Sequence, residues 1–182
     1  MILNLFSNPI FIIIACIIII TIFIVALVLI TKRPVPKTSN WVNNIQQEFA
    51  KNNLEYKLFK SDKSFYDYTL SINDKIFLIK LLYVPSYSEV QINNVVTWEI
   101  KFGAGKTPGK VQPFKKFATG IETFMNFKPE NKEIKVVIVS PTAKKITKYI
   151  NECEIVFVDA KTNVYGARVI NEDDYSLFIK KD

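Results

Sequence analysis

The sequence predicts an α/β (α+β) protein in which an N-terminal transmembrane helix precedes a mixed β-sheet domain with flanking helices. Three observations lead to this prediction. An apolar run occupies residues 10–30, with Thr21 as its only hydroxylated residue. Alternating apolar and polar residues recur between residues 54 and 102, and apolar residues at helical spacing flank those stretches. Alternation with a period of two is typical of half-buried strands, and recurrence every three or four residues is typical of amphipathic helices.

The apolar run is long enough to cross a bilayer. At about 1.5 Å per residue, a helix over this run measures roughly 31 Å, which matches the hydrocarbon core. A cleaved signal peptide needs basic residues before a shorter apolar core, whereas residues 1–9 contain no Lys or Arg. Ile13–Cys16 resembles a lipoprotein cleavage box, but isoleucines follow Cys16 and keep the segment apolar. We therefore expect an uncleaved anchor.

The basic residues beside the run predict its orientation. Lys32, Arg33 and Lys37 all follow it, and basic flanks stay in the cytoplasm. The lipid bilayer is thus an expected partner, and the expected location is the cell membrane, with a single pass and a cytoplasmic C-terminal domain. The predicted organisation is a short N-terminal segment at 1–9, a transmembrane helix at 10–31, a basic Pro-containing linker at 32–38 and a cytoplasmic α/β domain at 39–182.

Composition excludes several kinds of site. The chain contains no histidine, so a His-based triad, a His-ligated zinc site and a His-held haem are excluded. Cys16 lies in the expected anchor and Cys153 has no partner in the remaining sequence, so no disulfide framework is expected. Setting aside the three basic residues of the linker reduces the net charge from +7 to +4 for residues 38–182. This mild excess permits nucleic acid or lipid head groups as partners without requiring either.

Apolar spacing predicts a helix at the start of the domain, over residues 39–53. Trp41, Ile45 and Phe49 recur at four-residue intervals and give this helix one apolar face. Further helices are expected at 113–127 and 142–151, and a short one after Asn171, while strands are expected at 54–60, 65–72, 75–84, 95–102, 134–139, 155–158 and 164–170. The helix expected at 142–151 lies between two expected strands, and this strand–helix–strand unit predicts a right-handed crossover between parallel strands.

A hairpin is the most specific local prediction. Asn73-Asp74 is a two-residue turn signal, which pairs Ile72 with Lys75. Counting back along both strands places Asp67 directly opposite Lys80. Lys80 is a single charge within an otherwise apolar strand, so it needs a partner, and Asp67 is the candidate.

The strand expected at residues 95–102 carries the clearest charge pattern. Its even-numbered residues form an apolar face that contains Trp98 and Ile100. Its odd-numbered residues place Glu99 and Lys101 together on the other face. A carboxylate and an ammonium at this spacing are an arrangement that metal-dependent nucleases use.

The order of a helix, an antiparallel meander, a helix and a parallel strand resembles the core of the PD-(D/E)XK, or restriction-endonuclease-like, superfamily. The resemblance covers about residues 39–160, and Glu99-Ile100-Lys101 matches the Glu-X-Lys of that family. Members hold a divalent cation with this Glu and an acid on the preceding core strand, and their lysine helps to position the attacking water. Oxygen ligands suit Mg²⁺, which can generate a hydroxide and neutralise phosphate charge.

The resemblance implies a catalytic set of Asp67, Glu99, Lys101 and Gln112. Asp67 and Glu99 would hold Mg²⁺, and Gln112 resembles a polar residue that some members add. The sequence departs from the family where Tyr66 takes the place of the usual Pro before the acid.

The same charges also suit purely structural roles. Glu99 and Lys101 fit a solvated strand face, and Asp67 and Lys80 fit a cross-strand ion pair. Three functions therefore remain open from the sequence. They are an Mg²⁺-dependent nuclease, a degenerate relic that binds nucleic acid without cutting it, and a non-catalytic, membrane-tethered protein-interaction or scaffold domain.

Overall fold

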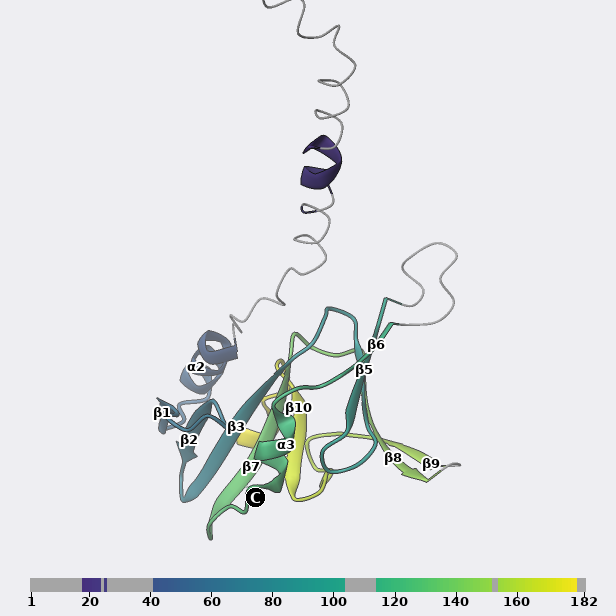
Figure 1. Cartoon of the computed structure of the whole chain (residues 1–182). Coiled ribbons are helices and arrows are strands. Elements are labelled where there is room, and N and C mark those ends of the chain that lie inside the picture. The colour runs from purple at the N-terminus through teal and green to yellow at the C-terminus, as the bar shows by residue number, and fades with distance from the viewer. Residues whose placement is uncertain (1–17, 24, 26–40, 104–113, 152–153, 180–182) are drawn as a thin grey trace, which may run out of the picture. The chain divides into compact units, whose positions relative to one another are not determined.

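The computed structural model describes residues 18–23, 25, 41–103, 114–151 and 154–179 (Figure 1). The chain divides into two compact units, Met1–Val35 and Pro36–Asp182. The elements of the second unit are α2 (Trp41–Lys51), β1 (Tyr56–Lys60), β2 (Tyr68–Ile72), β3 (Lys75–Tyr83), β4 (Glu89–Ile92), β5 (Trp98–Phe102), β6 (Phe114–Phe117), α3 (Ile121–Asn126), β7 (Glu133–Ser140), β8 (Lys145–Asn151), β9 (Glu154–Phe157), β10 (Ala167–Asn171) and α4 (Ser176–Ile179). Mixed strands with few helices confirm the α+β class.

The described strands form two five-stranded sheets, where the sequence predicted one. Sheet 1 has the order β1-β2-β3-β7-β10, and sheet 2 has the order β6-β5-β4-β8-β9. In sheet 1, β2 runs antiparallel to its neighbours β1 and β3, whereas β3, β7 and β10 are parallel. In sheet 2, only β4 and β8 pair in parallel. Both sheets are therefore mixed.

Corners that contain proline divide the strands between the sheets. Strands β3 and β7 are neighbours in sheet 1, and the strands that follow them, β4 and β8, are neighbours in sheet 2. Pro85 and Pro141 stand just after β3 and β7, and a proline cannot donate a ladder hydrogen bond. The Val84 N–H donates to the Ser140 carbonyl over 2.9 Å, which keeps the two corners side by side.

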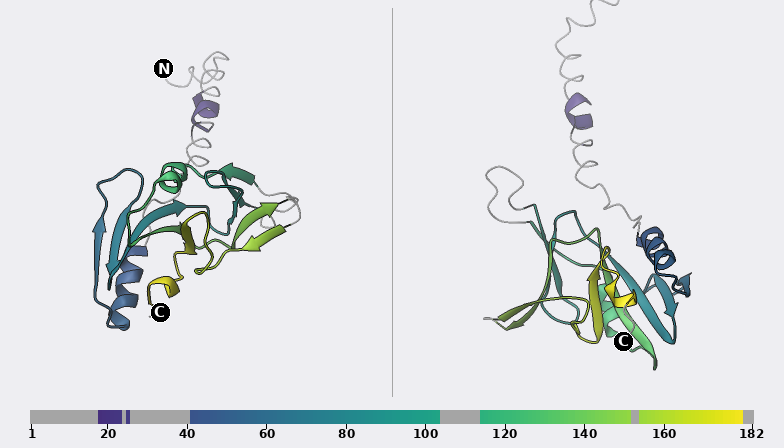
Figure 2. Two further views of the ribbon diagram at one scale, coloured as in Figure 1. Left: turned by 90° about the horizontal axis from the view of Figure 1, so that it is seen from below. Right: turned by 180° about the vertical axis from the view of Figure 1, so that it is seen from behind.

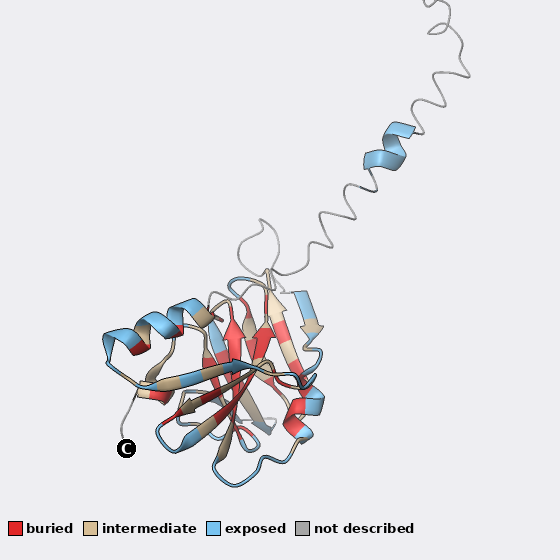
Figure 3. Ribbon diagram, turned by 90° about the vertical axis from the view of Figure 1, so that its left-hand side faces the viewer, coloured by how far each residue is buried: buried red, intermediate tan, exposed pale blue. Residues whose placement is uncertain are grey.

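Two hydrophobic clusters hold the layers together. The first lies between the sheets and combines Leu78 and Val137 of sheet 1 with Trp98 and Ile100 of sheet 2 and Phe124 of α3. The second lies between sheet 1 and the pair α2 and α4 (Figure 2). Buried residues concentrate in the strands, whereas the outward side of α2 is exposed (Figure 3). Because both clusters lie within the second unit, this unit has its own core.

Helix α2 confirms the predicted apolar face. Trp41, Ile45 and Phe49 are fully buried against sheet 1. The ring of Phe178 in α4 meets Phe49 edge-on at 6.4 Å between centroids and Trp41 at 6.5 Å. Edge-to-face aromatic pairs add to the stabilisation from area burial alone.

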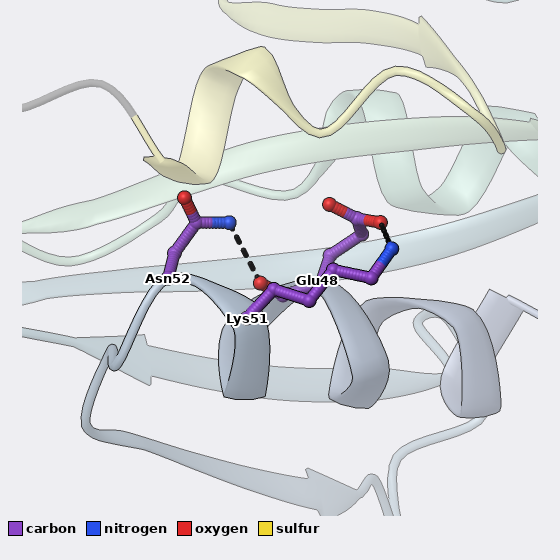
Figure 4. Close-up of polar contacts among 3 residues, drawn as sticks. All are labelled: Glu48, Lys51 and Asn52. Carbon is purple, nitrogen blue, oxygen red and sulfur yellow. Dashed lines mark hydrogen bonds and ion pairs between the residues drawn. The ribbon is translucent and has the colours of Figure 1, made fainter.

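Local side-chain contacts define the end of α2 (Figure 4). The Asn52 side-chain amide donates to the Glu48 carbonyl over 2.7 Å, and the Lys51 Nζ pairs with the Glu48 carboxylate at 2.6 Å. Asn53 then has φ of 50°, a left-handed conformation that asparagine tolerates and that commonly ends helices. These contacts explain why the helix stops before β1.

The β2–β3 hairpin has the predicted register. Ile72 pairs with Lys75, and Asn73 takes φ of 51° in the turn between them. The Asp67 N–H donates to the Ile79 carbonyl over 2.8 Å, which extends the pairing beyond β2. A two-residue turn therefore predicted the position of every charge on this hairpin.

The helix predicted over residues 113–127 is wrong. Its described part forms strand β6, then a turn, and only then the short helix α3. Gly120 precedes α3 with φ of 76°, a conformation that breaks any continuous helix and that glycine adopts without strain. β6 instead takes its hydrogen bonds from β5.

The helix predicted over residues 142–151 is also wrong, and with it the crossover. Lys145–Asn151 is β8, which pairs with β4 on one side and β9 on the other. Ile146, Thr147 and Tyr149 are β-branched or aromatic residues that favour strands when a partner is present. That partner, β4, lies between the strands predicted at residues 75–84 and 95–102, where no strand was expected.

The predicted transmembrane span lies largely outside the described residues. Residues 18–23 are helical, and residues 10–17, 24 and 26–31 are not described. No helix within the described ranges combines the length and the apolar composition needed to span a membrane.

Candidate functional site

Asp67 lies immediately before β2, where its own hairpin holds its carboxylate. Oδ2 accepts the Leu81 N–H at 2.7 Å and lies 3.5 Å from Nζ of Lys80. The Lys80 side chain is only 15% exposed, so this carboxylate supplies the partner that a half-buried ammonium requires. The predicted cross-strand ion pair is confirmed.

Glu99 and Lys101 lie on β5 with their side chains on one face. Trp98 and Ile100, between and beside them, are buried in the first cluster. Oε1 of Glu99 lies 3.4 Å from Nζ of Lys115 on β6, and the Glu99 side chain is 14% exposed. Lys101 Nζ donates to the Gln91 amide oxygen on β4 over 2.7 Å. Both side chains therefore have cross-strand partners.

The two parts of the predicted metal site belong to different sheets. The Asp67 carboxylate contacts Lys80 and Leu81 of sheet 1, and the Glu99 carboxylate contacts Lys115 of sheet 2. Among the described residues, no hydrogen bond or ion pair joins Asp67 or Lys80 to Glu99 or Lys101. Nor do the described ranges contain a group of three or more Cys, Asp or Glu side chains placed to hold a metal ion. The predicted catalytic residue Gln112 lies outside those ranges.

What the structure brings together is a polar surface on sheet 2. We call the side of sheet 2 that points away from the first cluster its outer face. Val90 and Ile92 of β4 point into the cluster, so the residues alternating with them point outward. Strand pairing aligns the outward residues in two rows, Phe117-Glu99-Gln91-Thr147-Phe157 and Lys115-Lys101-Glu89-Lys145. Thr147 of the first row is itself buried.

The charged side chains of the outer face have polar or charged partners on the same face. Besides the Glu99–Lys115 contact, the Glu89 carboxylate lies 3.2 Å from Nζ of Lys145. The amide of Gln91, which accepts from Lys101, donates in turn to the Asn93 side chain over 2.8 Å. Three lysines against two glutamates leave a charge close to neutral.

Exposed aromatic residues stand at both ends of the first row. The edge strand β6 exposes 65% of Phe117, and the opposite edge strand β9 exposes 72% of Phe157 and 55% of Ile155. Large apolar side chains on edge strands are unusual on a surface without partners, because such edges tend to pair or aggregate. The outer face therefore combines one row that ends in exposed aromatic residues with a second row of charged residues.

Glu89 and Gln91 are the site residues that sequence reasoning missed. They lie between the strands predicted at residues 75–84 and 95–102, although Glu89, Val90, Gln91 and Ile92 alternate between polar and apolar. Four residues are too few for this period to be distinctive, but the alternation was the available signal. The register then places Glu89 directly opposite Lys101.

A buried lysine stands on the other side of the first cluster. Lys135 of β7 is 4% exposed, and its Nζ donates to the carbonyls of Met125 and Phe127 over 2.6 and 2.9 Å. These carbonyls lie at the C-terminal end of α3, where a cation is favourable. Burial lowers the pKa of Lys135 from its ordinary value. Its role is to fix α3 against sheet 1.

Comparison with known proteins gave no match, either to a family model, to a curated protein or to a solved structure.

Proposed function

We propose that the chain is a single-pass membrane protein whose α+β domain is a non-catalytic protein-interaction module. The interaction surface is the outer face of sheet 2. The observation that carries this proposal is the mutual pairing of Glu99, Lys101 and Glu89 with side chains of the same face. A catalytic centre instead needs groups left available for a metal or substrate, with pKa values tuned to the reaction.

The mixed charge of the outer face favours a protein partner over nucleic acid. Binding to a phosphate backbone gains its affinity from clustered Lys and Arg. Here Glu89 and Glu99 lie between the lysines and would repel phosphate. Aromatic residues beside paired charges are typical of protein interfaces, in which aromatic residues are enriched. Phe117 and Phe157 would supply the apolar contacts.

The membrane anchor is part of the same proposal. Residues 18–23 and 25 are helical, and their described apolar side chains are between 52% and 65% exposed. Such a surface is stable in lipid but costly in water. Together with the run at 10–31 and the basic flank at Lys32, Arg33 and Lys37, it supports a cytoplasmic domain beside the cell membrane.

Site-specific photo-crosslinking tests the interaction surface. A benzophenone amino acid is placed at Phe117, at Phe157 or at Phe59, an exposed residue of β1 in sheet 1 that serves as the control. The same protein adduct is expected from both outer-face positions and not from Phe59. Equal adducts at all three positions, or an adduct that nuclease removes, would refute the proposal.

Orientation has its own test, which depends on the chain's cysteines. Cys153 belongs to the proposed cytoplasmic domain and Cys16 to the anchor. In intact cells, a membrane-impermeant maleimide should label neither, and it should label Cys153 after the membrane is opened. Labelling of Cys153 in intact cells would place the domain outside.

An Mg²⁺-dependent nuclease of the PD-(D/E)XK type is the second candidate. It is favoured by Glu89, which lies opposite Lys101 and beside the strand of Glu99, so that two carboxylates and a lysine share one face. Mg²⁺ would be held by these carboxylates through oxygen ligands. Mg²⁺-dependent cleavage of DNA or RNA that disappears in both Glu99→Ala and Lys101→Ala would establish this function and exclude the first.

A further inference from the structure

A cavity separate from the outer face of sheet 2 lies at the amino ends of β3, β7 and β10. Its volume is about 400 Å³, within the usual range of small-molecule sites. The floor comes from the face of sheet 1 that carries the second cluster, where Phe77 of β3 pairs with Ile134 of β7. The loop between β9 and β10 and the short helix α4 complete the walls.

Positive side chains dominate the lining of this cavity. Lys75, Lys161 and Arg168 line it, against a single acid, Glu133. One oxygen of the Glu133 carboxylate accepts a hydrogen bond from the Glu130 N–H at 2.8 Å, so this oxygen already has a donor within the protein. The Arg168 guanidinium donates to the Lys161 carbonyl, which fixes its position. That bond uses one of the five N–H donors that a guanidinium carries.

The floor of the cavity is apolar. Phe77 is 3% exposed, and Phe178 supports its ring edge-on at 5.1 Å between centroids. Phe77 thus forms the base of the cavity, and the half-buried Ile134, Ala160 and Leu177 supply the apolar surface that a ligand can reach. An inorganic anion would leave this apolar surface in contact with water, whereas an organic body would cover it.

We propose that this cavity binds a phosphate monoester with a flat apolar body, of about the size of a nucleoside monophosphate. Lys161 and Arg168 supply two positive charges, which match the charge of a phosphate monoester, about −1.5 to −2 at neutral pH. Arg168 and Lys161 bind the phosphate through charge-assisted hydrogen bonds, and the half-buried Ile134, Ala160 and Leu177 pack against the organic body. This site is independent of the function proposed above.

Calorimetric titration of the full chain in a neutral detergent tests both parts of the ligand. Adenosine 5′-monophosphate is the probe, and adenosine and inorganic phosphate are the part-ligands. The monophosphate is expected to bind at least about tenfold more tightly than either part, since each part satisfies only one wall of the cavity. Absence of monophosphate binding up to about 1 mM, or equal binding of inorganic phosphate, would overturn the proposal.

Variants then locate the binding to this cavity. Arg168→Gln and Lys161→Gln are each expected to weaken monophosphate binding by about tenfold or more, because each removes a charge-assisted contact. Lys128→Gln is the control, since Lys128 is an exposed residue that does not line the cavity. Arg168→Lys keeps the charge and should bind with intermediate affinity. Unchanged affinity in Lys161→Gln, which alters an exposed side chain and should fold normally, would place the ligand elsewhere.

Discussion

Asp67 provides the sharpest test of whether a predicted catalytic acid is instead a structural residue. In Asp67→Ala, the Leu81 N–H loses an acceptor at 2.7 Å and Lys80 loses its ion-pair partner. A hydrogen bond to a charged group contributes about 1.5–3 kcal/mol. Because Asp67 is 36% exposed, solvent screening limits the ion pair to about 0.5 kcal/mol. The expected loss of unfolding free energy is therefore about 2–3 kcal/mol.

Urea and thermal unfolding of residues 36–182, followed by circular dichroism, measure this loss. For a domain of this size the expected fall in Tm is about 6–12 °C. Asp67→Asn should retain most of the stability, since its amide oxygen can still accept the Leu81 N–H. Asp62→Ala is the matched control, an exposed acid in the loop before β2. If Asp67→Ala were as stable as Asp62→Ala, the structural role would be wrong, and a functional role for this carboxylate would regain support.

Four further predictions concern the core and the outer face. Lys135→Met should cost about 2–3 kcal/mol in urea unfolding because two carbonyls of α3 lose a charged donor, while the exposed control Lys128→Met should change little. The pKa of Lys135 is lower in the folded state than its ordinary value of 10.5, so between these two values the unfolded chain binds more protons than the folded one. The unfolding free energy of the wild type should therefore rise with pH in that window. Unfolding of Lys135→Met, measured over the same pH range, should lack this rise. Trp98→Ala should lose about 3–5 kcal/mol, measured in the same way, because Trp98 is fully buried between the sheets. Glu99→Gln should lose less than about 1 kcal/mol of unfolding free energy, since its partner Lys115 is 61% exposed. A larger loss would mean that this ion pair serves to stabilise the fold and would contradict its role in an interaction surface.

The sequence alone determined the elements whose hydrogen bonds and contacts are local. The four-residue spacing of Trp41, Ile45 and Phe49 predicted α2 because helical bonds close within one turn. The two-residue turn at Asn73-Asp74 likewise set the hairpin register and so predicted the Asp67–Lys80 pair. Local geometry was sufficient in both cases.

Tertiary pairing decided the rest. Residues 113–127 and 142–151 carry apolar spacing compatible with a helix, yet β6 and β8 are strands because β5 and β4 offer them ladder partners. β4 lies far from β8 in the sequence, and residues 103–113 separate β5 from β6, so neither β6 nor β8 can be recognised from its own residues. The same pairing separated Asp67 from Glu99 into two sheets and placed Glu89 opposite Lys101. The sequence thus determined which charges lie on strands, and only the tertiary structure decided which of them meet, because strand neighbours are set by long-range hydrogen bonds.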